Sequence, residues 1–170
     1  TSRMRELEAP LREGLRSMGL VLHDQQVRAL LDYLDLIAKW TKVYNLTAVR
    51  DPVEMLTHHL LDSLAVIEPL RRMLTSMHAG QGDATLGRHR LLDVGSGAGL
   101  PGVVIAICCP ELAVDCVDTV GKKAAFIQQV AASLRLPNLR GIHARVESLK
   151  DQYQVVSSRA FASLADFTQW

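Results

Sequence analysis

The chain has 170 residues, 48% of them hydrophobic, and a formal net charge of +1 at pH 7. This composition is enough for the core of one domain with an appendage, and the near-neutral balance gives no overall sign of a nucleic-acid-binding protein. No apolar run approaches the roughly 18 residues of a membrane span, and the N-terminal residues lack the apolar centre of a signal peptide, so a cytoplasmic protein is expected.

The N-terminal part of the chain is predicted to be helical. Apolar residues at spacings of three and four indicate a helix over residues 6–18 that ends at Gly19. A longer amphipathic helix is expected to start at Asp24, as its N-cap, and to run to Val43. Each helix has one apolar face, so both are expected to pack against the rest of the protein.

A third helix and a change of composition follow. Asp51 and Pro52 supply a cap and a first-turn proline for this helix, which is expected to end by Pro69. We therefore predict an N-terminal helical region over residues 1–75. Residues 76–89 are polar, rich in glycine and without periodicity, which is typical of a mobile linker.

Strands and helices alternate after this linker. Strands are predicted at residues 90–94, 112–117, 141–143 and 154–157, and helices from residue 101 and over residues 121–134. This order predicts a parallel sheet with helices on its faces, an α/β Rossmann-like core over residues 90–170. The chain ends at Trp170, inside the helix expected after the fourth strand, so the remaining C-terminal strands of the usual doubly wound sheet are expected to be missing.

Residues 91–102, LLDVGSGAGLPG, carry the strongest sign of a ligand site. An apolar run that opens into alternating glycines is typical of a strand that turns tightly into a helix, because glycine reaches positive φ at low cost. Gly95, Gly97 and Gly99 are expected to leave backbone N–H groups bare at the positive end of that helix, with Pro101 in its first turn. The alternative is a glycine-rich turn without a ligand.

The spacing of the glycines separates two classes of nucleotide. A dinucleotide fingerprint would have its third glycine at position 100, where this chain has Leu100. Asp93, two residues before Gly95, is expected to face the same pocket, which favours a cationic ligand over a pyrophosphate. We therefore predict S-adenosylmethionine, which carries a sulfonium and an amino group.

Further candidate residues follow the later strands. Asp118 comes 23 residues after Gly95, close to the offset at which an acidic side chain binds ribose hydroxyls, or it caps the next helix. Val146 and the backbone amide of Glu147 are expected to hold an adenine, or they only start a helix. Arg159, after the fourth strand, is expected to meet the carboxylate of the ligand or an RNA phosphate, or to be an ordinary surface arginine.

Several motifs together resemble the glucose-inhibited division protein B family, the bacterial small-subunit rRNA guanine-N7 methyltransferases. They are YNLTA at 44–48, HHLLDSL at 58–64, the glycine stretch at 91–102, VD at 117–118 with GKK at 121–123 and Phe126, RVE at 145–147 and SRAFASL at 158–164. The resemblance runs from about Trp40 to Trp170, with the motifs in the order of the family. It implies a class I methyltransferase fold with an N-terminal helical extension.

The resemblance also implies a reaction and a set of contacts. S-adenosylmethionine would be the methyl donor, and a loop guanine of 16S rRNA, free or in the small ribosomal subunit, would be the acceptor. Carried over position by position, the family's donor contacts fall on Gly95, Leu100, Val146, Glu147 and Arg159. The alternatives are a methyltransferase with another substrate and an inactive RNA- or nucleotide-binding module.

The proposed chemistry needs few catalytic side chains. N7 of guanine has an in-plane lone pair and no proton to lose, so alignment and desolvation matter more than a general base, and no catalytic residue is predicted. A splayed-out guanine needs a stacking surface, for which Tyr44, Phe126 and Phe161 are candidates, although such residues are more often part of a core. His58 and His59 lack a third ligand, so no metal is expected.

The last expectations concern the state of the three cysteines and the oligomeric state of the protein. Cys108, Cys109 and Cys116 lie in apolar surroundings without C-x-x-C spacing, which predicts buried free thiols rather than disulfides or zinc ligands. A monomer without a membrane partner is expected.

Overall fold

The computed structural model describes residues 5–44, 54, 59–79, 89–95, 98–149, 153 and 155–158. Its helices are α2 (Glu8–Met18), α3 (Asp24–Tyr44), α5 (Leu61–Leu64), α6 (Ile67–Ala79), α7 (Gly102–Cys108), α8 (Gly121–Ser133) and the 3₁₀ helix η3 (Val146–Ser148). Its strands are β1 (Arg90–Val94), β2 (Ala113–Asp118), β3 (Leu139–His143) and β4 (Val155–Ser158). No helix in these ranges is long and apolar enough to cross a membrane.

The described strands form a parallel sheet in the order β3-β2-β1-β4. The predicted α/β class with a parallel sheet is therefore confirmed, and the strand boundaries differ from the predicted ones by at most two residues. The strand order reverses at β1, because β2 and β3 lie on one side of it and β4 lies on the other. In open sheets of this kind, ligands bind outside the carboxyl ends of the strands at such a reversal.

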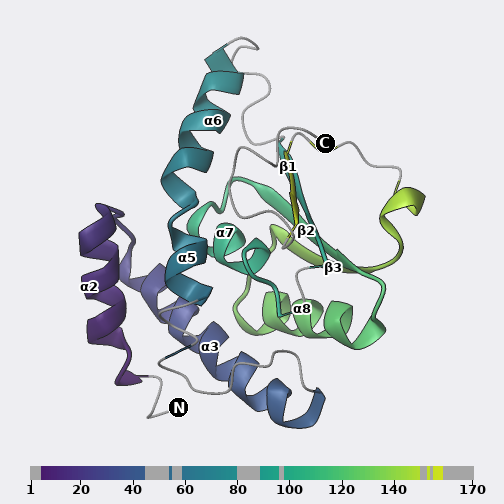
Figure 1. The fold of residues 1–170 in the computed structure, drawn as a ribbon, viewed down its shortest axis with the longest axis horizontal. Coiled ribbons are helices and arrows are strands. Elements are labelled where there is room, and N and C mark those ends of the chain that lie inside the picture. The colour runs from purple at the N-terminus through teal and green to yellow at the C-terminus, as the bar shows by residue number, and fades with distance from the viewer. Residues whose placement is uncertain are drawn as a thin grey trace.

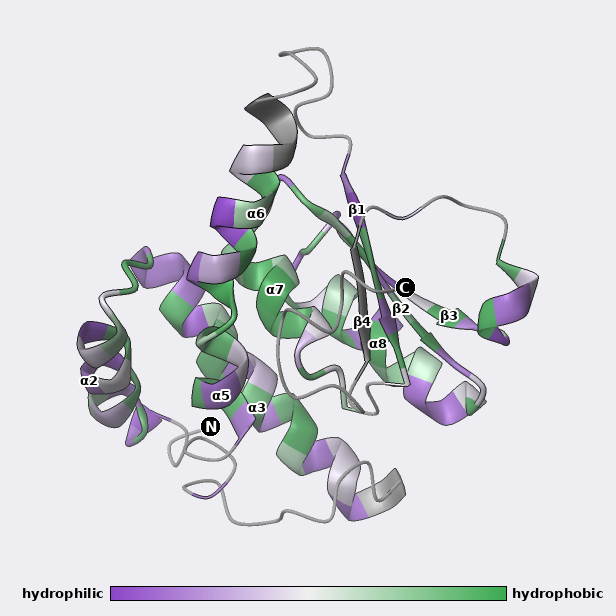
Figure 2. Cartoon of the chain, turned by 45° about the horizontal axis from the view of Figure 1, so that its top comes forward, coloured by the Kyte–Doolittle hydropathy of each residue, from purple (hydrophilic) through white to green (hydrophobic). Residues whose placement is uncertain are grey.

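Helices α7 and α8 lie between the sheet and the N-terminal helices (Figure 1). Every residue of α7 is buried, and the helix is hydrophobic along its whole length (Figure 2). Helix α3 packs on both α7 and α8, and its Trp40 meets Phe126 of α8 edge-on, with ring centroids 5.3 Å apart. The N-terminal helices and the sheet region thus share one continuous hydrophobic core.

The first two helices have the predicted extents but one different cap. Helix α2 ends at Gly19, whose φ of +69° is the left-handed conformation that glycine adopts cheaply. The prediction that Asp24 is the N-cap of α3 is wrong, because Asp24 is the first helical residue and its carboxylate pairs with Arg12 at 3.1 Å. Instead, the side-chain Oε1 of Gln26 accepts the His23 backbone N–H at 2.9 Å, as in a capping box.

Two proline predictions also need correction. The third helix was expected to end by Pro69, but α6 begins at Ile67 and continues to Ala79, with Pro69 in its first turn, where a missing N–H costs nothing. Pro101 is the N-cap of α7 rather than its first residue. Residues 51–53 and 55–58 of the predicted third helix and residues 80–88 of the predicted linker lie outside the described part, and the three-part domain division stays a prediction.

The far end of α7 is held by side chains from other elements. Asn138, just before β3, donates from Nδ2 to the carbonyls of Ala106 at 3.0 Å, Cys109 at 3.3 Å and Leu112 at 2.9 Å. Gln26 of α3 donates to the Ile107 carbonyl at 3.1 Å. The bonds to Ala106 and Ile107 satisfy carbonyls in the last turn of α7, and together these contacts tie the helix end to β3 and α3.

Candidate functional site

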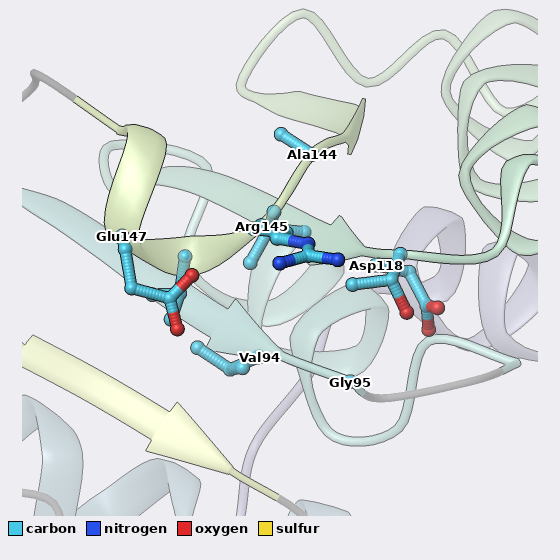
Figure 3. Close-up of a pocket in the computed structure, with 9 residues that line it drawn as sticks. Val94, Gly95, Asp118, Ala144, Arg145 and Glu147 are labelled. Carbon is cyan, nitrogen blue, oxygen red and sulfur yellow. The ribbon is translucent and has the colours of Figure 1, made fainter.

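A cleft of about 600 Å³ opens at the carboxyl ends of β1, β2 and β3, within the size range of small-molecule sites. Residues at the ends of these strands and just after them surround it (Figure 3). Its described lining is Val94, Gly95, Val117, Asp118, Thr119, Ala144, Arg145, Val146 and Glu147. Four residues predicted from the sequence as donor contacts, Gly95, Asp118, Val146 and Glu147, are therefore brought together.

Gly95 presents bare backbone to this cleft. Its φ is +65°, and its N–H donates to the Val117 carbonyl of β2 at 2.9 Å. A Cβ built on Gly95 meets no described atom within 4 Å, so the space beside it is open. An open Cα in a left-handed conformation at the mouth of a cleft is the arrangement that lets a ligand approach the main chain closely.

The other described glycines of this stretch serve packing. A Cβ on Gly99, whose φ is +97°, would lie 2.5 Å from Val103 Cγ2 and 2.7 Å from Ile127 Cδ1. A Cβ on Gly102 would lie 2.5 Å from both a carboxylate oxygen of Asp93 and the sulfur of Cys116. These two glycines allow the start of α7 to approach the sheet and α8, whereas Gly95 alone among them faces open space.

Asp93 does not face the cleft, contrary to the prediction from its position. It has no exposed surface, and its Oδ2 accepts the Gly102 backbone N–H at 2.8 Å. The carboxylate thus caps the first turn of α7 from inside the fold. The amide of Gly102 is therefore used inside the fold. The N–H of Gly95, which was expected to be bare, is also used, because it donates to the Val117 carbonyl.

Asp118 lies at the end of β2 and is half-buried. Its Oδ1 accepts the Val120 backbone N–H at 2.8 Å, which shapes the turn into α8. Its Oδ2 has no hydrogen-bond partner among the described residues and is available to a ligand. The two readings of Asp118 are compatible, because one oxygen holds the turn while the other is left for the cleft.

Val146 and Glu147 lie on the short helix η3. The Arg145 carbonyl accepts both the Ser148 hydroxyl at 2.7 Å and the Ser148 N–H at 3.0 Å, which fixes this turn at the edge of the cleft. First-turn amides have no acceptor within their own helix, and none of the described residues accepts the Glu147 N–H, so this N–H can meet a ligand. The Arg145 side chain is exposed and points toward Asp118 (Figure 3).

Other predicted residues are not brought to the cleft. Leu100 is only 8% exposed, belongs to the hydrophobic core and does not line the cleft. Phe126 has no exposed surface and packs against Trp40, so it is a core residue rather than a platform for a base. Gly97, Arg159, Phe161 and His58 lie outside the described residues, as does the side chain of Tyr44.

The structure also shows residues that the sequence reading missed. Thr119 and Ala144 line the cleft, and their position just after strand ends was the available signal. Arg145, which the sequence placed at this edge without a role, lines it too. Tyr33 reaches the glycine stretch from α3, which no local pattern indicates. Within the described residues, no group of three or more His, Cys, Asp or Glu residues forms a metal site.

Comparisons with known proteins point to one family across most of the chain. The model of the GidB family, described as rRNA small subunit methyltransferase G, matches residues 26–170. The ribosomal RNA small subunit methyltransferase G of Albidiferax ferrireducens is 70% identical over 166 residues, 98% of this chain and 74% of that protein. Proteins of the same name from a Polaromonas species and from Verminephrobacter eiseniae are 68% and 56% identical, over 98% and 96% of this chain and 71% and 72% of their own lengths.

Proposed function

Because the chain belongs to the rRNA small subunit methyltransferase G family, we propose that it transfers a methyl group from S-adenosylmethionine to N7 of a loop guanine in 16S rRNA. The family supports an rRNA methyltransferase, and the resemblance of the motifs supports the N7 position. The single observation that carries the donor assignment is the cleft that brings Gly95, Asp118, Val146 and Glu147 together. The site of action would be the cytoplasm, where the small ribosomal subunit is assembled.

The cleft residues fit this donor. The bare Cα of Gly95 leaves room for the ligand beside the main chain, where a side chain would intrude. The Oδ2 atom of Asp118 would accept hydrogen bonds from ribose hydroxyls, since its Oδ1 is already engaged. Val146 would contact the adenine ring, and the Glu147 N–H would donate to it. We also propose contacts from Gly97, Leu100 and Arg159, the contact of Leu100 through its backbone.

The proposed reaction needs positioning more than proton transfer. When bound, the donor supplies an activated methyl group on its sulfonium. The guanine N7 lone pair carries no proton, so no residue has to remove one, and the chain contributes by holding both reactants in line and excluding water. N7 lies on the major-groove edge, which is inaccessible in an A-form helix, so the acceptor would be a looped or splayed-out base.

Two measurements test this proposal. Calorimetry with S-adenosylmethionine and with NAD should show binding of the first and none of the second. Incubation with radiolabelled donor and small-subunit RNA, as naked RNA and as assembled subunits, should label one guanine, and mass mapping should place the methyl group on N7. Binding of NAD alone would overturn the donor assignment. Donor binding with label on another substrate would overturn the acceptor, and donor binding without any transfer would indicate a binding module.

A further inference from the structure

Tyr33 of α3 joins the N-terminal helices to the glycine stretch. Its side chain has no exposed surface, and its hydroxyl donates to the Ala98 carbonyl at 2.6 Å, across 65 residues of sequence. Ala98 is itself only 1% exposed, so this hydrogen bond is shielded from water. A short, buried hydrogen bond of this kind holds its acceptor firmly, because a buried carbonyl without a donor costs free energy.

Among the described residues, this contact and two others tie the turn between β1 and α7 to the side chains and strands around it. The N–H of Gly95 bonds to β2 at 2.9 Å, and the N–H of Gly102 bonds to Asp93 at 2.8 Å. These two bonds fix the ends of the turn from within the sheet region. The bond from Tyr33 to Ala98 fixes its middle from outside the sheet.

Tight packing reinforces this hydrogen bond. A Cβ on Gly99 would lie 3.3 Å from the Tyr33 hydroxyl oxygen, so the phenol is close to the bare Cα of the next residue. The Gly99 carbonyl accepts the Val103 N–H at 2.6 Å, which begins the hydrogen-bonding of α7. The ring pair of Trp40 and Phe126 holds α3 against α8 farther along the same helix. The position of α3 therefore sets the position of the turn.

We propose that Tyr33 is a positioning residue of the donor site, and this role rests on the proposed function. Its hydroxyl keeps the Ala98 carbonyl in place, and so keeps the Gly95 end of the turn open to the donor. Without the hydroxyl, the Ala98 carbonyl loses its buried donor and the turn relaxes toward another partner. The N-terminal helical region then forms part of the donor site, although none of its described residues lines the cleft.

The test compares two tyrosines of the full chain. Tyr33→Phe removes the hydroxyl that bonds to Ala98, and Tyr153→Phe removes a hydroxyl that donates to Asp115 at 2.8 Å and does not line the cleft. For Tyr33→Phe, calorimetry should show an affinity for S-adenosylmethionine weaker by about fivefold or more. For Tyr153→Phe, the affinity should stay within roughly twofold of the wild type.

A second readout separates positioning from general destabilisation. Amide hydrogen exchange at Val103, whose N–H bonds to Gly99, should quicken in Tyr33→Phe and not in Tyr153→Phe when both are compared at equal stability. With 4-aminophenylalanine in place of Tyr33, a weaker N–H donor remains, so affinity should fall only about two- to threefold. If Tyr33→Phe does not fold, the variant with 4-aminophenylalanine takes its place in the test.

The outcomes are distinct. If the wild type binds the donor and the folded Tyr33 variants bind it equally well, the positioning role is wrong while the proposed function stands. If the wild type does not bind S-adenosylmethionine, the proposed function fails and the role of Tyr33 in it fails too. Equal losses of donor affinity in Tyr33→Phe and Tyr153→Phe would also refute the role, because they would show only a general effect of stability.

Discussion

Asp115 and Arg140 form a two-point ion pair between β2 and β3, with Arg140 Nε 2.7 Å from Oδ1 and Nη2 2.6 Å from Oδ2. The Asp115 side chain is 1% exposed, whereas that of Arg140 is 47% exposed. Arg90 of β1 lies 3.7 Å from the same carboxylate, and Tyr153, just before β4, donates to it. One buried carboxylate thus connects three strands and the approach to the fourth.

This network predicts how stability depends on pH. Burial alone would raise the pKa of Asp115, but hydrogen bonds from Arg140 and Tyr153 and the nearby positive charges outweigh it and hold the pKa below its ordinary value. The contribution of the Asp115 carboxylate to the free energy of unfolding is therefore fully present at pH values above the unfolded-state pKa of about 3.9. It is lost as the pH falls through the lower folded-state pKa. Urea unfolding between pH 7 and pH 3 should show this loss.

Asp115→Asn is the matching variant for that experiment. It should lower the free energy of unfolding at pH 7 by roughly 1–3 kcal/mol, a moderate cost because the exposed Arg140 can be solvated again. The difference between wild type and variant should shrink toward pH 3. A constant difference across this range would show that the charge of Asp115 does not contribute.

Gly95→Ala should separate ligand binding from folding. The new methyl group meets no described atom, so the variant should fold with a cost of about 1–2 kcal/mol from the left-handed backbone, while the affinity for S-adenosylmethionine should fall at least about tenfold. Gly19→Ala is the control, because Gly19 has a φ of +69° and equally open space at the end of α2. It should show the same destabilisation with normal donor affinity. Normal affinity in Gly95→Ala would place the donor elsewhere.

Asp118→Asn should weaken donor binding with little effect on stability. The amide oxygen can still accept the Val120 N–H, so the turn into α8 is kept, but the charged acceptor for the ribose is lost. We expect an affinity roughly tenfold weaker by calorimetry and a stability change within about 0.5 kcal/mol. Asp24→Asn, which alters an exposed carboxylate outside the cleft, should leave donor affinity unchanged.

The cysteines should be inert in the folded protein. All three are buried and free, as predicted from the sequence. Burial raises the pKa of Cys108 to about 12 and is the largest cause that raises the pKa of Cys109 to about 11, so almost no thiolate forms at pH 8. A thiol reagent such as Ellman's should label no thiol in the native protein and three in urea. Rapid labelling of the native protein would show that α7 opens.

The sequence was informative where the pattern is local. Strand and helix periodicity predicted the four strands that the structure describes, and the offset between Gly95 and Asp118 placed both at the edge where the structure puts them. Asp93 was misjudged because a position beside the turn does not tell which face of the strand a side chain occupies, and this one points into the fold. Tyr33 was missed because its partner is 65 residues away, a distance at which no periodicity operates.

The amide of Asn138 has two hydrogens and three carbonyl oxygens around it. A carboxylate, which only accepts hydrogen bonds, cannot replace this amide, since it would place a further acceptor against three carbonyl oxygens. Spontaneous deamidation, which converts asparagine to aspartate, would therefore set a negative charge against three carbonyl dipoles. Deamidation of Asn138 should weaken the contacts between α7 and the sheet. In a preparation stored for a long time, the deamidated molecules should therefore unfold before the others.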